Sequence, residues 1–106
     1  PAERTELNVI HSDATLIVSH GELSGGSLLT KKFAEKHRKL FLHVDFAILP
    51  PETAVALTRR RLAAAGCRIL NVAGSRASED AQIYRKTKEF LERLFASDEL
   101  RISNAS

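Results

Sequence analysis

The 106-residue sequence has little cysteine: one residue, Cys67, which excludes an intramolecular disulfide and any cluster of metal-binding thiolates. Cys67 stands at the start of an apolar run, where a small buried thiol is the ordinary role. So little cysteine is consistent with a reducing compartment, and we expect a cytoplasmic protein. A chain of this length has room for one domain with one core.

Long hydrophobic runs are absent too. The sequence contains neither a run of 18 apolar residues nor a signal-peptide pattern, so we expect no membrane span and no membrane partner. Aromatic residues make up only 6% of the chain, while the net charge is +3. Nucleic-acid platforms combine basic residues with stacking aromatics, so we expect no nucleic-acid partner either.

Several catalytic motifs are missing. We find no Gly-x-Ser-x-Gly elbow and no local Cys/His pair, so the sequence does not indicate nucleophilic catalysis. A Walker-type lysine is also absent, because Ser27 follows Gly25-Gly26. The four histidines lack metal-ligand spacing, and we assign no metal site.

What the sequence does contain is an alternation of short apolar runs and helical patterns. Residues 15–19, 40–46 and 68–73 read as strands buried on both faces, as in a parallel sheet. Helical periodicity precedes the first run, over residues 1–13, and also follows each of the three strands. This order predicts an α/β protein of the Rossmann-like, three-layer α/β/α class with a small, mostly parallel sheet.

Two glycine-containing loops follow strands and lead into helices. The first spans residues 19–27 and includes Gly25-Gly26, and the second spans residues 71–78 and includes Gly74. Glycine lets the backbone approach a ligand, and the first N–H groups of a helix have no intrahelical partner. Ligands of parallel α/β sheets bind at the carboxyl ends of the strands, so these loops predict an anion or phosphate site.

Side chains near these loops have structural alternatives. Asp45, near the end of the middle strand, could bind a ribose hydroxyl or hold a loop by hydrogen bonding. Ser78 could cap the last helix instead of touching a ligand. Gly74 could be present only because the backbone there needs a positive φ. Arg76 offers donors to phosphate or carboxylate but could pair with neighbouring acids.

The ordered blocks of the chain resemble the putative molybdenum carrier family. They are Arg4-Thr5, Asn8-Val9, the run from Ser12 to Leu16, the Gly21 to Thr30 loop, His43-Val44-Asp45 and the Asn71 to Ser78 loop. That family belongs to the circularly permuted branch of Rossmann-like ligand-binding proteins. The resemblance implies a nucleotide-like or molybdenum-cofactor-like ligand, and homo-oligomers.

The resemblance also implies particular contacts. Together with the loops, it places the candidate ligand contacts at Ser19, Gly21, Ser24, Gly25, Gly26, Ser27, Thr30, Asp45, Asn71, Gly74, Arg76 and Ser78, with Arg4 and Asn8 as further candidates. Family members begin with a strand and a Gly-Gly-Gln-Thr-Gly-type loop that this sequence does not contain. We therefore expect a single domain over residues 1–106 that lacks the N-terminal part of the family's fold.

Three functions remain open from the sequence. The favoured one is a binding protein for a phosphate-bearing or oxyanion small molecule, with molybdenum cofactor or a nucleotide as the possible ligand. The alternatives are an enzyme that resembles nucleoside-monophosphate phosphoribohydrolases, and a truncated module that acts only through oligomerisation. The glutamate that such hydrolases carry after their glycine loop has no counterpart after Gly25-Gly26, which favours binding over catalysis.

Overall fold

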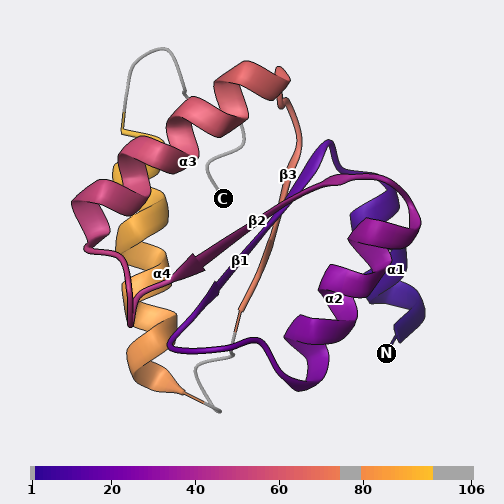
Figure 1. Cartoon of the computed structure of the whole chain (residues 1–106), viewed down its shortest axis with the longest axis horizontal. Coiled ribbons are helices and arrows are strands. Elements are labelled where there is room, and N and C mark those ends of the chain that lie inside the picture. The colour runs from indigo at the N-terminus through magenta and orange to yellow at the C-terminus, as the bar shows by residue number, and fades with distance from the viewer. Residues whose placement is uncertain (1, 75–79, 97–106) are drawn as a thin grey trace.

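The computed structural model describes residues 2–74 and 80–96, which form helices and strands in alternation (Figure 1). The elements are α1 (Ala2–Ile10), β1 (Ala14–Ser19), α2 (Gly25–Lys36), β2 (Leu40–Asp45), α3 (Pro51–Ala65), β3 (Leu70–Ala73) and α4 (Ala81–Leu94). Helices α1 and α2 pack together on one face of the sheet, and α3 and α4 pack together on the other. These three layers confirm the predicted Rossmann-like α/β class.

The sheet is parallel and has the strand order β2-β1-β3. Strand β1 lies in the middle, with Ala14 opposite both Leu40 and Leu70, and with Ser19 opposite Asp45. Because it has a neighbouring strand on each side and helices over both faces, β1 is buried from Ala14 to Val18. That is why its sequence is almost continuously apolar instead of alternating.

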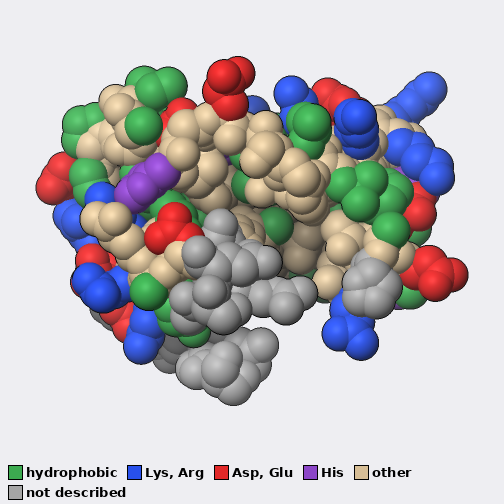
Figure 2. Space-filling model, turned by 90° about the horizontal axis from the view of Figure 1, so that it is seen from below, with side chains coloured by type: hydrophobic (Ala, Val, Ile, Leu, Met, Phe, Trp, Pro, Cys, Tyr) green, Lys and Arg blue, Asp and Glu red, His purple; other side chains and the backbone are tan. Residues whose placement is uncertain are grey.

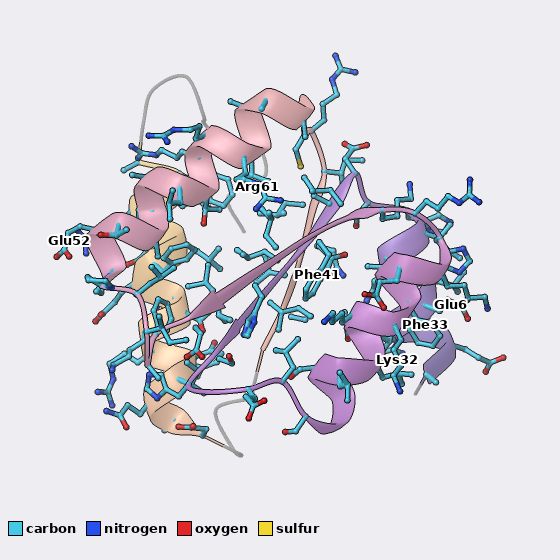
Figure 3. All side chains as sticks on the ribbon, viewed as in Figure 1. Glu6, Lys32, Phe33, Phe41, Glu52 and Arg61 are labelled. Carbon is cyan, nitrogen blue, oxygen red and sulfur yellow. The ribbon has the colours of Figure 1, made fainter. Side chains whose placement is uncertain are left out.

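The main core lies between the sheet and the α3/α4 layer. Its buried members are Leu16, Val18, Leu42, Val44, Ala54, Val55, Phe90 and Leu94. Alternate residues of β1 point to the opposite face, where Ile17 is fully buried beneath the α1/α2 layer. Phe41 also lies between the sheet and α2 (Figure 3). Lys31 Nζ lies 5.9 Å from the centre of its ring.

Strands β1 and β2 differ by one residue from the predicted ranges, and two further boundaries need a fuller correction. Helix α2 begins at Gly25, so Gly25-Gly26 form its first turn instead of a loop that precedes it. Gly25 has a φ of 52°, a conformation that side chains rarely adopt. Strand β3 begins at Leu70 and not at residue 68, because Asp13 binds the backbone N–H groups of Arg68 and Ile69.

The ends of α3 and α4 show how their sequences stop and start helices. Gly66 ends α3 in the left-handed conformation, as its position after the apolar stripe predicts. The cap of α4 is Asp80, whose Oδ1 accepts hydrogen bonds from the N–H groups of Gln82 and Ile83. The prediction that Ser78 caps this helix is therefore wrong, and Ser78 itself lies outside the described residues. None of the described helices is long and apolar enough to cross a membrane.

Candidate functional site

The direction of the chain connections reverses at β1. The connection from β1 to β2 passes through α2 on one face, whereas the connection from β2 to β3 passes through α3 on the other. The segments that follow β1 and β3 therefore leave the sheet toward opposite faces. In open α/β sheets this reversal creates a crevice at the carboxyl ends of the strands, where ligands bind.

The loop after β1 is held by Asp45. Its Oδ1 accepts hydrogen bonds from the backbone N–H of Gly21 at 2.7 Å and from that of Ala47 at 2.9 Å. These two bonds, first that of Gly21 and then that of Ala47, hold the pKa of the Asp45 carboxyl below its usual value. Gly21 has a φ of 95°, so the clamp fixes a backbone shape that favours glycine.

Ser19 also contacts this loop. Its hydroxyl donates to the carbonyl oxygen of Gly21 at 2.7 Å and lies 2.7 Å from His43 Nε2. With its proton donated to Gly21, the Ser19 oxygen is placed to accept an N–H from His43. Ser19, Gly21 and Asp45 therefore shape the loop, and none of the three lines the cavity described next.

A cavity of about 530 Å³ opens between α1, the first turns of α2 and the end of β3. Its lining residues are Thr5, Asn8, Ser24, Gly26, Ser27, Thr30, Asn71, Val72, Ala73 and Gly74. The molecule is hollowed on the side where the strands end, and backbone and uncharged polar side chains, both drawn in tan, make up most of the middle of that face (Figure 2). Seven of the predicted contact residues are thus brought together from three separate segments.

The first turn of α2 faces this cavity with little internal hydrogen bonding. Ser24 occupies the N-cap position, but its side chain caps no N–H group. Among the described residues, no carbonyl or side chain accepts from the N–H groups of Gly25 and Gly26. Thr30 is buried and donates its hydroxyl proton to Gly26 O at 2.9 Å, so its oxygen remains available only as an acceptor. An anion placed here would meet unused donors and the positive end of the helix dipole.

The end of β3 forms the opposite wall. Asn71 donates from Nδ2 to the Thr15 hydroxyl oxygen on β1 at 3.3 Å. Gly74 has no positive φ, so the alternative explanation that it serves only such a turn does not apply. A Cβ on Gly74 would lie 3.1 Å from Val18 Cγ2, so glycine there permits close approach of the chain to β1.

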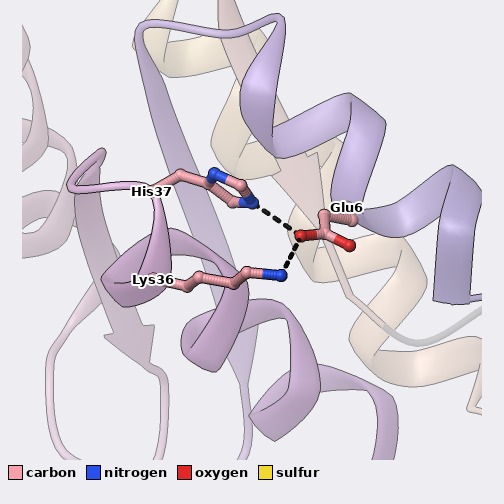
Figure 4. A network of polar contacts seen from close by, with 3 residues as sticks. All are labelled: Glu6, Lys36 and His37. Carbon is pink, nitrogen blue, oxygen red and sulfur yellow. Dashed lines mark hydrogen bonds and ion pairs between the residues drawn. The ribbon is translucent and has the colours of Figure 1, made fainter.

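Helix α1 supplies the third wall, and polar contacts of Glu6 hold it against the C-terminal end of α2. Glu6 Oε2 lies 2.8 Å from Lys36 Nζ and 2.6 Å from His37 Nε2 (Figure 4). The hydrogen bond to Lys36, followed by that to His37, lowers the pKa of Glu6. This clamp fixes the position of α1, which carries the cavity residues Thr5 and Asn8.

Some predicted residues are not part of this arrangement. Gly25 and Arg4 are exposed and do not line the cavity. Arg76 and Ser78 lie outside the described residues. Sequence reasoning did not select Thr5, Val72 or Ala73, although Thr5 stands in a block that carries the family resemblance. Its three-residue spacing from Asn8 places both on one helix face, a signal that could have identified it.

The described part of the lining carries no charged side chain and no imidazole. It therefore offers hydrogen bonds but no general acid or base. Cys67 is half-buried, and burial, followed by the nearby Asp13 carboxylate, raises the pKa of its thiol, which disfavours the reactive thiolate. Across residues 2–74 and 80–96, no group of three His, Cys, Asp or Glu residues is placed to hold a metal ion.

The layers, the reversal of connections and the polar crevice together define a Rossmann-like α/β protein with a candidate small-molecule cavity at the carboxyl ends of its strands. Within that class, the chain belongs to the circularly permutated YpsA SLOG family, which it matches over residues 1–95. The predicted kinship with circularly permuted Rossmann-like proteins is thereby confirmed.

A solved structure supports the same assignment. The crystal structure of a putative molybdenum carrier protein from Syntrophus aciditrophicus SB is 44% identical to this chain, with a TM-score of 0.84. The similarity covers 88% of this chain but only 59% of that protein. No curated protein gives a significant match.

Proposed function

We propose that this chain forms the cavity-bearing part of a carrier that binds a small molecule with a phosphate or another oxyanion and does not transform it. The observation that carries this proposal is the cavity of about 530 Å³ at the carboxyl ends of the strands. Its size falls within the range of roughly 300–1,000 Å³ that is usual for small-molecule sites.

The chemistry of the walls supports an anionic group at α2. The N–H group of Gly26 and the hydroxyls of Ser24 and Ser27 line the cavity and have no partner among the described residues. Hydrogen bonds from such fixed donors to an anion are stronger than those to a neutral group. The absence of an acid or base from the described lining favours binding over hydrolysis.

The relative with a solved structure suggests the cargo. That protein is named a putative molybdenum carrier, and molybdate and a phosphate-bearing cofactor would both use the donors at α2. We therefore include molybdate, molybdopterin compounds and nucleotides among the candidate ligands. The similarity covers only 59% of that relative. That this chain shares a carrier activity of the longer protein is therefore part of the proposal.

Titration calorimetry of the 106-residue protein tests the proposal with inorganic phosphate, molybdate, nucleoside monophosphates and molybdopterin compounds. We expect at least one to bind, and Ser27→Ala to weaken that binding by about 3–10-fold, as for the loss of one hydrogen bond. Thr58→Val, a buried change on α3 away from the cavity, should bind normally.

Two outcomes would contradict the proposal. The first is the absence of binding heat for every compound. The second is turnover: chromatography of a nucleoside monophosphate incubated with the protein should show it unchanged, and release of the free base would indicate a phosphoribohydrolase instead of a carrier.

A further inference from the structure

We infer that the cavity selects a phosphomonoester with a polar, uncharged body, that Asn71 binds this body, and that Thr15 positions Asn71. This inference rests on the proposed function and specifies the class of ligand. It assigns a role in recognition to Thr15, a residue of the central strand that does not line the cavity.

The volume of the cavity argues against a bare oxyanion as the whole ligand. A tetrahedral oxyanion needs on the order of 100 Å³, if each oxygen is given a space similar to the roughly 30 Å³ that a water molecule occupies in the liquid. The cavity measures about 530 Å³ and would remain mostly unfilled around such an ion. A ligand that fills it must extend from α2 to the walls formed by β3 and α1.

The walls formed by β3 and α1 suit neutral polar groups. They contain the amide side chains of Asn71 and Asn8, and their described parts carry no charge. The Asn8 side chain has no hydrogen-bond partner among the described residues, and neither does Asn71 Oδ1. These atoms suit hydroxyl, amine or ring N–H groups, as found on sugars and nucleobases.

Thr15 explains how the Asn71 amide is oriented. The two residues lie directly opposite each other in the β1–β3 register, and Thr15 is fully buried. Its hydroxyl has one partner within the described chain, the Nδ2 group of Asn71 at 3.3 Å. A buried hydroxyl in an otherwise apolar strand is costly unless it is hydrogen-bonded, and valine would fill the same space.

This bond leaves Asn71 Oδ1 as the available acceptor. Thr15 can therefore influence recognition without touching the ligand, because it restricts the rotation of the amide that does. A hydroxyl needed only for stability would affect the binding of all ligands equally, or of none. A positioning hydroxyl should affect only ligands that reach Asn71.

Calorimetry with inorganic phosphate and adenosine 5′-monophosphate as probes separates these roles. In the wild type, we expect adenosine 5′-monophosphate to bind at least about tenfold more tightly than phosphate, from one or two additional hydrogen bonds. Thr15→Val should weaken the binding of the nucleotide by about 3–10-fold and leave the affinity for phosphate unchanged. Asn71→Leu should do the same more strongly, and Thr15→Ser should restore nucleotide affinity. Thr58→Val serves as the matched buried control.

The side-chain amide signal of Asn71 in a ¹⁵N–¹H spectrum gives an independent readout. It should shift on addition of the nucleotide and stay in place with phosphate. Asn71 is only half-buried, so Asn71→Leu keeps the test usable even if Thr15→Val fails to fold.

The outcomes distinguish this inference from the proposed function. Equal nucleotide affinity in wild type, Thr15→Val and Asn71→Leu would overturn the inference but leave the carrier proposal standing. Binding of phosphate without preference for the nucleotide would do the same. If the wild type binds neither probe, the inference fails, and the wider ligand panel then decides the proposed function.

Discussion

Gly26 is the residue at which ligand binding and stability should separate most clearly. A Cβ added there would meet no heavy atom within 4 Å, because the position faces the cavity. Gly26→Ala should therefore leave the free energy of unfolding unchanged, or raise it by up to about 1 kcal/mol, since alanine loses less entropy in a helix. The added methyl group should weaken ligand binding by roughly tenfold through lost hydrogen bonds. Urea denaturation and calorimetry on the same samples measure the two effects.

The neighbouring Gly25 provides the control. It is exposed and outside the cavity lining, but its φ of 52° disfavours any side chain. Gly25→Ala should reduce the free energy of unfolding by about 1–2 kcal/mol, the cost of a left-handed residue. Wild-type affinity in Gly26→Ala would show that the ligand does not approach this turn.

At the scale of single elements, the start of α4 depends on Asp80. Its carboxylate accepts two backbone N–H groups at 3.1 Å, and α4 contributes the buried Phe90 and Leu94 to the core. Asp80→Ala should lower the free energy of unfolding by about 1 kcal/mol, as measured by urea denaturation. Asp80→Asn retains a cap acceptor and should lose much less. Equal losses in the two variants would show that the hydrogen bonds are not the stabilising feature.

Helix α1 depends on a polar contact with the end of α2. Glu6 joins α1 to Lys36 and to His37, the C-cap residue of α2 (Figure 4). Helix α1 also carries Asn8, which lines the cavity. Glu6→Gln removes the charge, so α1 should open more often, and the amide protons of α1 near Val9 should exchange several-fold faster with deuterium. Glu3→Gln changes an exposed acid of the same helix and should have no such effect. Identical exchange in the two variants would argue against the clamp.

The elements themselves were predictable because their signals are local. The apolar run of β1 reflects burial on both faces, and Gly66 ends α3 through its own backbone conformation, without depending on distant contacts. The role of Asp45 was not predictable in the same way. Its position at a strand end was clear, but binding to Gly21 depends on β2 lying beside β1. Side chains that hold loops and side chains that hold ligands have the same sequence pattern.

At the scale of the whole molecule, sequence could identify the class of fold but not the strand order that creates the crevice. The cavity brings together α1, α2 and β3, which are distant in sequence, and Thr15 joins this arrangement only through its register with Asn71. Neither the β1–β3 pairing nor the packing of α1 on α2 has a local signature. The sequence therefore predicted the loops that contribute to the site, but it did not indicate which residues of these loops face the same cavity.

The same long-range contacts make the molecule sensitive to acid. Asp13 on the α1–β1 turn accepts hydrogen bonds from the backbone N–H groups of Ile69 and Arg68. Asp45 holds the loop after β1 in the same way, and Glu6 binds the end of α2. Each of these contacts lowers the pKa of the carboxyl group concerned. The usual pKa values are 4.5 for Glu6 and 3.8 for the two aspartates. At mildly acidic pH the folded protein therefore holds fewer protons on these groups than the unfolded protein does. Their contribution to stability is complete above about pH 5.5 and declines as the pH falls through the usual values toward the lower folded ones.

We expect the urea midpoint to be insensitive to these three groups between pH 6 and pH 7 and to fall steadily below about pH 5. Asp13→Asn removes one titrating group that joins the α1–β1 turn to the segment before β3, so its midpoint should be lower at pH 7 and should decline less steeply in acid. Glu89→Gln changes an exposed acid on α4 and should keep the wild-type slope. If Asp13→Asn also keeps that slope, the backbone contacts of Asp13 do not contribute to acid sensitivity, and the loss of stability must come from the other carboxylates.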